Sequence, residues 1–298
     1  MSRFSGRLRS VLVCTALLLA AGCAGAPGAT SVGPAPDLFE ALPPPSPPPT
    51  AVPTTVPPSR GTDDDSRGST NGASSASRTR SGVDWQPAYS FDFDGSRLDT
   101  SVWNPYNSVG GFGHGYRRPS AISVEDGLLR ITARDDVTGG MGHRVDQKYG
   151  RWEFRARLDK GRGFGSAILL WPETENKDDG ELDMMEVPHE DRGEAHFVIH
   201  YSEENKLAGT DIRGDFSQWH TFAMDWLPDR ITWYVDGVKQ FETTDRNVIP
   251  KVPMHMTIQL DMGPFEEWIP APDATTPEEV NLEVDWVKIY KAPREARR

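Results

Sequence analysis

The stretch GELDMMEVP, residues 180–188, decides the fold of this chain. It places three acids, Glu181, Asp183 and Glu186, within six residues and surrounds them with leucine, methionine and valine. Carboxylates are costly to bury among apolar side chains, so the presence of three of them here indicates a functional role. Because side chains alternate between the two faces of a β-strand, Glu181 and Asp183 share a face. The stretch therefore predicts a strand with one acidic and one apolar face.

A β-bulge is needed to bring the third acid onto the acidic face. Strict alternation would turn Glu186 to the apolar side. One extra residue at Met184–Met185 resets the phase and returns Glu186 to the face of Glu181 and Asp183. The two glutamates remain about 13 Å apart along the strand. Only a concave strand with inward-leaning side chains brings their carboxyls to about 5–5.5 Å, the separation expected of a retaining glycosidase.

The sequence around this strand also has β patterns. Segments that alternate, or run apolar with β-branched and aromatic residues, are 122–134, 151–158, 196–201, 231–237 and 254–260. Turn signals separate the segments at Asp126-Gly127, Gly139-Gly140, Asp236-Gly237 and Gly263-Pro264. Helical periodicity is weak throughout. Many short strands with turns predict an all-β fold, a two-sheet sandwich or a barrel.

Residues 1–22 predict an export signal. Arg3, Arg7 and Arg9 precede an apolar run at 11–22 that is too short to span a membrane. Cys23 follows small residues, which resembles a bacterial lipobox. We expect a lipidated Cys23 to anchor the protein at the outer face of the bacterial cell membrane. Ordinary secretion, after cleavage at the A-x-A sequence 24–26, is the alternative.

Residues 23–83 predict a disordered tether rich in Pro, Ser and Gly. The proline run 43–58 is expected to be extended and semi-rigid, and residues 61–82 to be flexible coil. Proline runs also bind aromatic-lined grooves, but a spacer is favoured here. Residues 84–298 form the remaining, folded domain. They contain no cysteine, so the domain's stability must come from its core.

The net charge of the chain argues against some classes of binding partner. A net charge of −12 argues against nucleic acid, which requires a basic face. It argues equally against binding to anionic lipid by charge alone, which leaves the lipid anchor as the expected link to a membrane. A neutral polysaccharide is a compatible partner. Nothing in the sequence requires an oligomer, so we expect a monomer.

The acidic motif resembles a known signature. The pattern E-[LI]-D-x-x-E at 181–186 is similar to the active-site motif of glycoside hydrolase family 16, in its bulged, laminarinase-like form. The blocks 149–172, 218–242 and 283–290 agree with the family in order and spacing. The resemblance covers about residues 88–291. It implies a concanavalin A-like jelly-roll sandwich whose concave sheet forms a cleft for β-linked polysaccharide, with no cofactor required.

The resemblance also implies the roles of the acids. Glu181 would be the nucleophile, Glu186 the general acid and then the base, and Asp183 a hydrogen-bonding partner of the nucleophile. Like charges in close quarters push pKa values apart, so one glutamate is expected to be ionised while the other keeps its proton.

Further side chains are expected in the cleft by the same resemblance. Trp171 would offer a flat apolar surface to a sugar ring, and His200 and Gln259 would face the cleft. His114 lies in the loop 104–120, which is expected at the cleft entrance. Trp268 fits either the cleft edge or the core. The other tryptophans considered are expected to pack inside: Trp103, Trp152, Trp219, Trp226, Trp233 and Trp286.

Metal sites are a weaker expectation. Many family members hold a structural Ca²⁺, and Asp285 is the candidate ligand by resemblance. The acids at 178–179 and 190–191 would suit calcium as well, although the apolar residues between the acids of 181–186 do not. His189 and His196 lie seven residues apart and do not form HExxH, so the sequence does not favour a zinc site.

These observations favour a retaining endo-glycosidase that hydrolyses a β-glucan or a galactan. A lectin-like binding module on the same fold is the main alternative, and a transglycosylase would share the covalent intermediate. The sequence GGFGHGYRRPS at 110–120 departs from the laminarinase pattern. Loops on a common scaffold determine which polymer fits, so the linkage stays open.

Overall fold

The computed structural model describes residues 83–297, which form two β-sheets packed face to face. The expectation of an all-β, two-sheet fold is confirmed. In the described part the only helical elements are three short 3-10 turns: η1 (Pro119–Ala121), η2 (Lys177–Asp179) and η3 (Arg294–Arg297). The expected signal 1–22, Cys23 and the expected tether as far as residue 82 lie outside the described residues.

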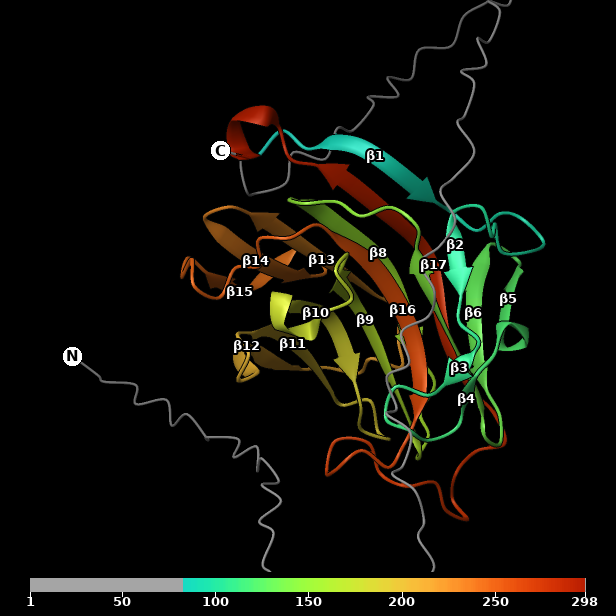
Figure 1. The fold of residues 1–298 in the computed structure, drawn as a ribbon. Helices are drawn as coiled ribbons and strands as arrows, with labels where there is room; N and C mark the ends of the chain where they lie inside the picture. Colours follow the sequence, from blue (N-terminus) through green and yellow to red (C-terminus); the bar gives the residue numbers. More distant parts are fainter. Residues whose placement is uncertain (1–82, 298) are drawn as a thin grey trace, which may run out of the picture. The chain divides into compact units, whose positions relative to one another are not determined.

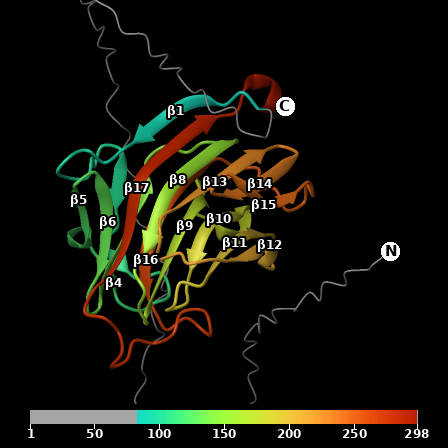
Figure 2. The ribbon, with the colours of Figure 1, turned by 180° about the vertical axis from the view of Figure 1, so that it is seen from behind.

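The first sheet has eight antiparallel strands: β1 (Gln86–Phe91), β5 (Ile122–Glu125), β6 (Leu128–Ala133), β8 (Gly150–Leu158), β13 (His220–Leu227), β14 (Arg230–Val235), β15 (Val238–Thr243) and β17 (Val280–Lys291). Their order is β15-β14-β13-β8-β17-β6-β5, with β1 paired to β17. The first and last strands of the domain therefore lie side by side (Figures 1 and 2).

The second sheet has nine strands: β2 (Trp103–Pro105), β3 (Ser108–Val109), β4 (Tyr116–Arg117), β7 (Val137–His143), β9 (Phe164–Pro172), β10 (Glu181–Val187), β11 (Glu194–Tyr201), β12 (Lys206–Arg213) and β16 (Met254–Met262). Their order is β12-β11-β10-β9-β16-β7-β4-β3, with β2 paired to β7. The acidic strand β10 thus lies between β9 and β11, with no free edge. Figure 1 shows this sheet in front, and Figure 2 shows the first sheet in front.

The core lies between the two sheets. Trp152 and Phe154 alternate on β8, and Ile168 and Leu170 alternate on β9, all of them at most 1% exposed. Complete burial of such a side chain contributes about 1.5–3 kcal/mol each. The predictions that place tryptophans in the core are confirmed for four of them: Trp103, Trp152, Trp226 and Trp233.

Two tryptophan predictions are wrong. Trp286 is half-buried and lies beneath Lys288, because a bulge at Asp285 turns it to the outer face opposite Arg155. Trp219 is also half-buried and stacks on the guanidinium groups of two arginines, each 4.7 Å from its ring. Both rings pack against positively charged side chains on the outside of the eight-stranded sheet.

The turn predictions have mixed outcomes. Asp236-Gly237 joins β14 to β15, with positive φ at both residues, as a tight hairpin requires. Gly139-Gly140 is not a turn but lies within β7. The ring of Tyr106 covers this strand, and a Cβ on Gly140 would lie 2.8 Å from it. A Cβ on Gly139 would instead lie 2.7 Å from Ile131, so both glycines allow close packing, a use of glycine that resembles a turn signal in sequence.

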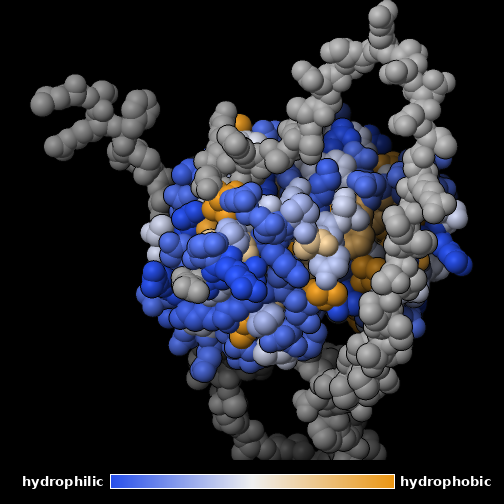
Figure 3. All heavy atoms as spheres, turned by 90° about the horizontal axis from the view of Figure 1, so that it is seen from above, coloured by the Kyte–Doolittle hydropathy of each residue, from blue (hydrophilic) through white to orange (hydrophobic). Residues whose placement is uncertain are grey.

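The surface gives a limited view of partners. The face of the molecule in Figure 3 is mainly hydrophilic, with small apolar areas between polar ones. Within residues 83–297 no helix is long and apolar enough to cross a membrane. The monomeric state stays a prediction.

Candidate active site

The register of β10 carries its three acids to one face of the nine-stranded sheet. On β11, the partners of Glu181, Asp183 and Glu186 are residues 200, 198 and 196, which are spaced by two. On β9, the partners of Asp183 and Glu186 are residues 169 and 167. Since directly paired residues point to the same side, all three acids share one face. The bulge predicted at Met184–Met185 is confirmed, because β10 has one more residue there than either neighbour.

This surface, here called the acid face, is the side of the nine-stranded sheet away from the core. Glu181 and Glu186 are half-buried on it, and Asp183 between them is 1% exposed. Leu182, on the opposite side of the strand, is completely buried in the core. The glutamates therefore reach solvent while their surroundings are largely dry.

His200 lies beside the acids from the next strand. Its Nε2 is 3.3 Å from Asp183 Oδ2, an ionic contact without the geometry of a hydrogen bond. Its Nδ1 is 2.9 Å from Asn205 Oδ1. Since an amide oxygen only accepts, Nδ1 carries a hydrogen, and Nε2 is left to face the carboxyl. His200 thus lies on the acid face, as expected from the resemblance.

Burial dominates the electrostatics of the acids. It raises the pKa of Glu181 and that of Asp183 to about 8, and the charge of Asp183 adds to the effect on Glu181. Burial, followed by the charges of Asp183 and Glu181, also raises the pKa of Glu186 well above its ordinary value. The sequence suggested that the two glutamates would separate in pKa. In this structure both are raised, because desolvation acts on the whole group.

No lysine or arginine among residues 83–297 forms an ion pair with these three acids. Of the neighbouring groups, His200 is the one whose electrostatic interaction lowers the pKa values of both glutamates. Three neighbouring carboxyl groups whose pKa values are all raised share protons near neutral pH. The site can therefore offer a proton to a leaving group and a carboxylate to a developing positive charge.

Other expected residues lie on the same face. Trp171 pairs with His255, and its Nε1 donates to Glu175 Oε2 over 2.9 Å, with the ring half-buried. Gln259 is half-buried and pairs with Ala167, the β9 partner of Glu186, so it points to the acid face. The structure thus brings Trp171 and Gln259 to the side of the acids. Their contact with substrate stays a prediction.

The loops at the sheet's edge hold the remaining expected residues. His114 is exposed in the loop between β3 and β4, with no contact that ties it to the acids. In the same loop Phe112 stacks on Phe265, with ring centroids 4.2 Å apart. Trp268, left open by the sequence, packs at a tilt against His196, with ring centroids 4.3 Å apart, and His196 pairs with Glu186. Trp268 therefore borders the acid face.

The sequence did not identify Tyr106 and Asp261 as polar groups on this face. Tyr106 shares a hydrogen bond with Thr257, 3.1 Å between their oxygens. Arg117 forms a two-fold contact with the buried Asp261 of β16, through Nε at 2.8 Å and through Nη2. The signal available for Asp261 was its two-residue spacing from Gln259 on one strand. Its partner lies 144 residues away, and no local pattern shows that pairing.

Asp285 lies on the opposite sheet, at the β17 bulge, and pairs with Arg155. It belongs to neither of the two clusters of three ligating groups found among residues 83–297. Its part in a calcium site stays a prediction, without support from neighbouring carboxylates.

The fold and this site together define a class of protein. Two glutamates and an aspartate on the half-buried outer face of a β-sandwich are residues of the kind that a glycoside hydrolase uses. The model of glycosyl hydrolases family 16 matches residues 115–288, more than half of the chain, and the chain belongs to this family.

Individual relatives agree with this assignment. The chain is 28% identical over 249 residues to the beta-glucanase of Rhodothermus marinus, covering 70% of this chain and 85% of that protein. It is 26% identical over 256 residues to glucan endo-1,3-beta-glucosidase A1 of Niallia circulans, covering 67% of this chain but only 37% of that protein. The X-ray structure of endo-beta-1,3-glucanase from Pyrococcus furiosus matches with a TM-score of 0.66 and 24% identity, over 72% of this chain and 97% of that one. This likeness confirms the jelly-roll sandwich.

Proposed function

We propose that this protein is a retaining endo-glycosidase that hydrolyses a β-glucan outside the cell. The observation that carries the proposal is the bulged strand β10, which sets Glu181, Asp183 and Glu186 on one half-buried face. The printed functions of the two sequence relatives favour a β-glucan over a galactan. Export and anchoring through Cys23 are part of the proposal and rest on the sequence of residues 1–26.

The mechanism follows from the roles of two carboxyls. Glu181 attacks the anomeric carbon while Glu186 gives its proton to the departing glycosidic oxygen, so that the C–O bond breaks and a glycosyl ester forms. Glu186, now a carboxylate, takes a proton from water as that water attacks the same carbon and releases Glu181. Asp183 lies between the two and is positioned to share a proton with Glu181.

The test is Glu181→Gln in the full chain, assayed with purified β-1,3-glucan, mixed-linkage glucan and β-galactan. We expect the wild type to release reducing ends from a glucan and the variant to release none while still binding the polymer. NMR of the first product should show the β-anomer. Reducing-end release by Glu181→Gln at the wild-type rate would exclude this nucleophile. Binding without hydrolysis by the wild type would indicate a lectin, and longer products in the presence of an acceptor would indicate a transglycosylase.

A further inference from the structure

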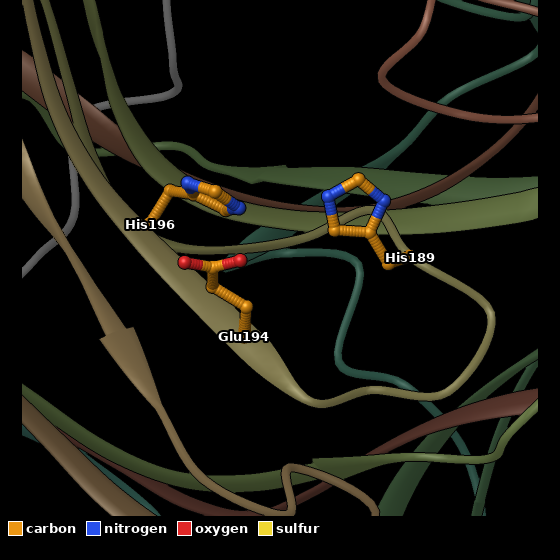
Figure 4. Close-up of side chains that lie close together, drawn as sticks. All are labelled: His189, Glu194 and His196. Carbon is orange, nitrogen blue, oxygen red and sulfur yellow. The ribbon is translucent and has the colours of Figure 1, made fainter. Parts of the chain in front are cut away.

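Two histidines and a glutamate meet at one end of the acid face. His189 lies in the loop after β10, and Glu194 and His196 lie at the start of β11. Each offers one ligand atom, and the three atoms lie within 4.8 Å of one another. Figure 4 shows the two imidazole rings with nitrogens facing each other and the carboxylate of Glu194 beside them. We call these three residues the His-Glu-His cluster.

In the central residue of the cluster, His196, one ring nitrogen has a hydrogen-bond partner and the other has none within residues 83–297. Its Nδ1 is 2.7 Å from Asp211 Oδ1 on the neighbouring strand β12. An ionised carboxylate can only accept, so Nδ1 carries the hydrogen, and in the neutral imidazole Nε2 presents a lone pair. His196 is 6% exposed, and Nε2 has no hydrogen-bond partner within residues 83–297. A buried polar atom without a partner is costly, so a ligand at Nε2 would stabilise the folded domain.

Two other histidines show what is particular to this one. His220 also faces an aspartate, with Nδ1 2.7 Å from Asp236 Oδ2, but its Nε2 is satisfied by a backbone carbonyl at 3.2 Å. His143 is buried with a bare Nε2, but the rings around it are aromatic, and no cluster of ligating groups includes it in the described part. Among these three, His196 alone combines a bare nitrogen, a carboxylate on the other nitrogen and further ligating groups.

We propose that the His-Glu-His cluster binds Zn²⁺ through His189, Glu194 and His196 Nε2. Two imidazoles and one carboxylate are a preferred donor set for zinc, with a fourth position open to water or another ligand. A carboxylate that accepts from the far nitrogen of a ligating histidine fixes its tautomer and orientation, which is the place that Asp211 holds. Ideal tetrahedral ligands lie about 3.3–3.4 Å apart. The half-buried His189 and Glu194 need only small side-chain rotations to reach that spacing.

The surroundings of the cluster suit a bound metal ion. Trp268 packs at a tilt against both rings, with its centroid 4.3 Å from that of His196 and 6.2 Å from that of His189. This apolar cover limits access of water to the ligands from that side. The loop that carries His189 is also held by backbone hydrogen bonds, one of which joins Arg192 N to the carbonyl of His189 over 3.0 Å.

The cluster adjoins the proposed catalytic group without sharing a residue with it. His196 is the direct cross-strand partner of Glu186, and both point to the acid face. A metal ion there would join the loop after β10 to strand β11, and its open position would lie beside the acid face. Sugar hydroxyls are oxygen donors that such a position can accept. The metal site does not depend on the proposed hydrolysis, because its ligands are distinct from Glu181, Asp183 and Glu186.

The experiment is a titration of the EDTA-dialysed full chain with ZnCl₂ by calorimetry, with thermal unfolding measured in parallel. We expect one equivalent of Zn²⁺ to bind and to raise the unfolding temperature, since a ligand that binds the folded state stabilises it. His196→Ala and Glu194→Gln should each lose that equivalent. Asp211→Asn should weaken binding by about 10–100-fold, the usual effect of removing a partner of a ligating histidine.

His220→Ala is the matched control, since it removes a histidine paired with an aspartate on the other sheet. It should bind Zn²⁺ as the wild type does. Glu194→Gln keeps the shape of the side chain, so it remains informative should His196→Ala fail to fold. A second readout is the visible absorption of bound Co²⁺, expected in the wild type and absent in both cluster variants. Equal Zn²⁺ binding by the wild type and Glu194→Gln, or no binding by the wild type, would overturn the proposal.

Discussion

The buried acids on the outer face of the eight-stranded sheet and the three acids of strand β10 are treated in opposite ways. On the outer face of the eight-stranded sheet, Asp225 is 1% exposed and accepts from Arg151 over 2.6 Å, and Glu283 is 5% exposed and accepts from two arginines. On the acid face, Asp183 is equally buried, but within residues 83–297 it has no arginine or lysine as an ion-pair partner. The same residue types are thus paired with arginines on the eight-stranded sheet, as Asp261 of β16 also is, whereas the β10 acids have no such partner within residues 83–297.

The pKa directions follow this difference. Burial alone would raise the pKa of Glu283, but hydrogen bonds from Arg130 and Arg157 outweigh it and hold the pKa below its ordinary value. For Glu181 and Asp183 nothing outweighs burial, and their pKa values are raised. Paired carboxylates stabilise a sheet, whereas uncompensated carboxyls keep protons that chemistry can use. The contrast supports the proposal that the β10 acids are the reactive ones, on grounds separate from the sequence motif.

The largest expected effect concerns Glu186. Glu186→Gln removes the proton donor and should lower kcat by about 10²–10⁴-fold, the usual contribution of a general acid. The folded state should be at least as stable as the wild type, because a buried ionisable group is replaced by a neutral one. Steady-state kinetics on the β-glucan hydrolysed by the wild type and thermal unfolding measure the two effects. Unchanged kcat would contradict the assignment of Glu186.

The matching change on the other sheet should do the reverse. Asp225→Asn breaks a buried ion pair with Arg151 and weakens the hydrogen bond from Tyr234, so we expect a loss of about 3–5 kcal/mol in the free energy of unfolding. Chemical denaturation checks this value. The kcat of the protein that remains folded should not change. A loss below about 1 kcal/mol would show that this pair contributes no more than a surface one.

The pH dependence of stability should have opposite signs for Asp183, which has no arginine partner among residues 83–297, and for Glu283, which is paired with arginines. The folded-state pKa of Asp183 is raised, so the folded protein holds a proton that the unfolded chain releases above its ordinary value of 3.8. This contribution to stability is complete below that pH and is lost as the pH rises from about 4 through about 8. Asp183→Asn should remove that loss and gain stability relative to wild type toward pH 8, as measured by denaturation across the range.

The contribution of Glu283 to stability should change with pH in the opposite direction, and Glu283→Gln tests this. Because the folded-state pKa of Glu283 is lowered, its contribution is present above the ordinary value of 4.5 and is lost as the pH falls through the folded pKa. The variant should therefore be less stable than wild type at neutral pH, with the difference shrinking in acid. Parallel pH dependence in the two variants would contradict the comparison.

The smallest expected effect concerns two half-buried tryptophans. Trp171→Ala should raise KM for the glucan by an amount equivalent to about 0.5–1.5 kcal/mol, the usual contribution of an aromatic stacking contact. Trp286→Ala, on the other sheet beneath Lys288, should leave KM unchanged. Equal KM values for both variants and the wild type would show that Trp171 does not contact the sugar.

Much of the fold was predictable because its signals are local. Alternation and the Asp236-Gly237 turn indicated strands and a hairpin, and both are present. Trp286 was misplaced because a bulge, which has no sequence signature of its own, changed the phase of β17. Gly139-Gly140 was misread because its reason is tertiary packing: Gly140 lies against the ring of Tyr106, more than 30 residues away in the chain, and Gly139 lies against Ile131.

The sequence by itself determined the family, the all-β class and the three acids, because a two-residue period and a short motif are properties of neighbouring residues. Only the tertiary structure decided which charges meet. Within residues 83–297 it left Asp183 without an arginine as an ion-pair partner, paired Asp261 with Arg117, and brought His189 and Glu194 close to Nε2 of His196. The physical reason is that desolvation and ligand geometry depend on groups that strand pairing brings together from distant parts of the chain.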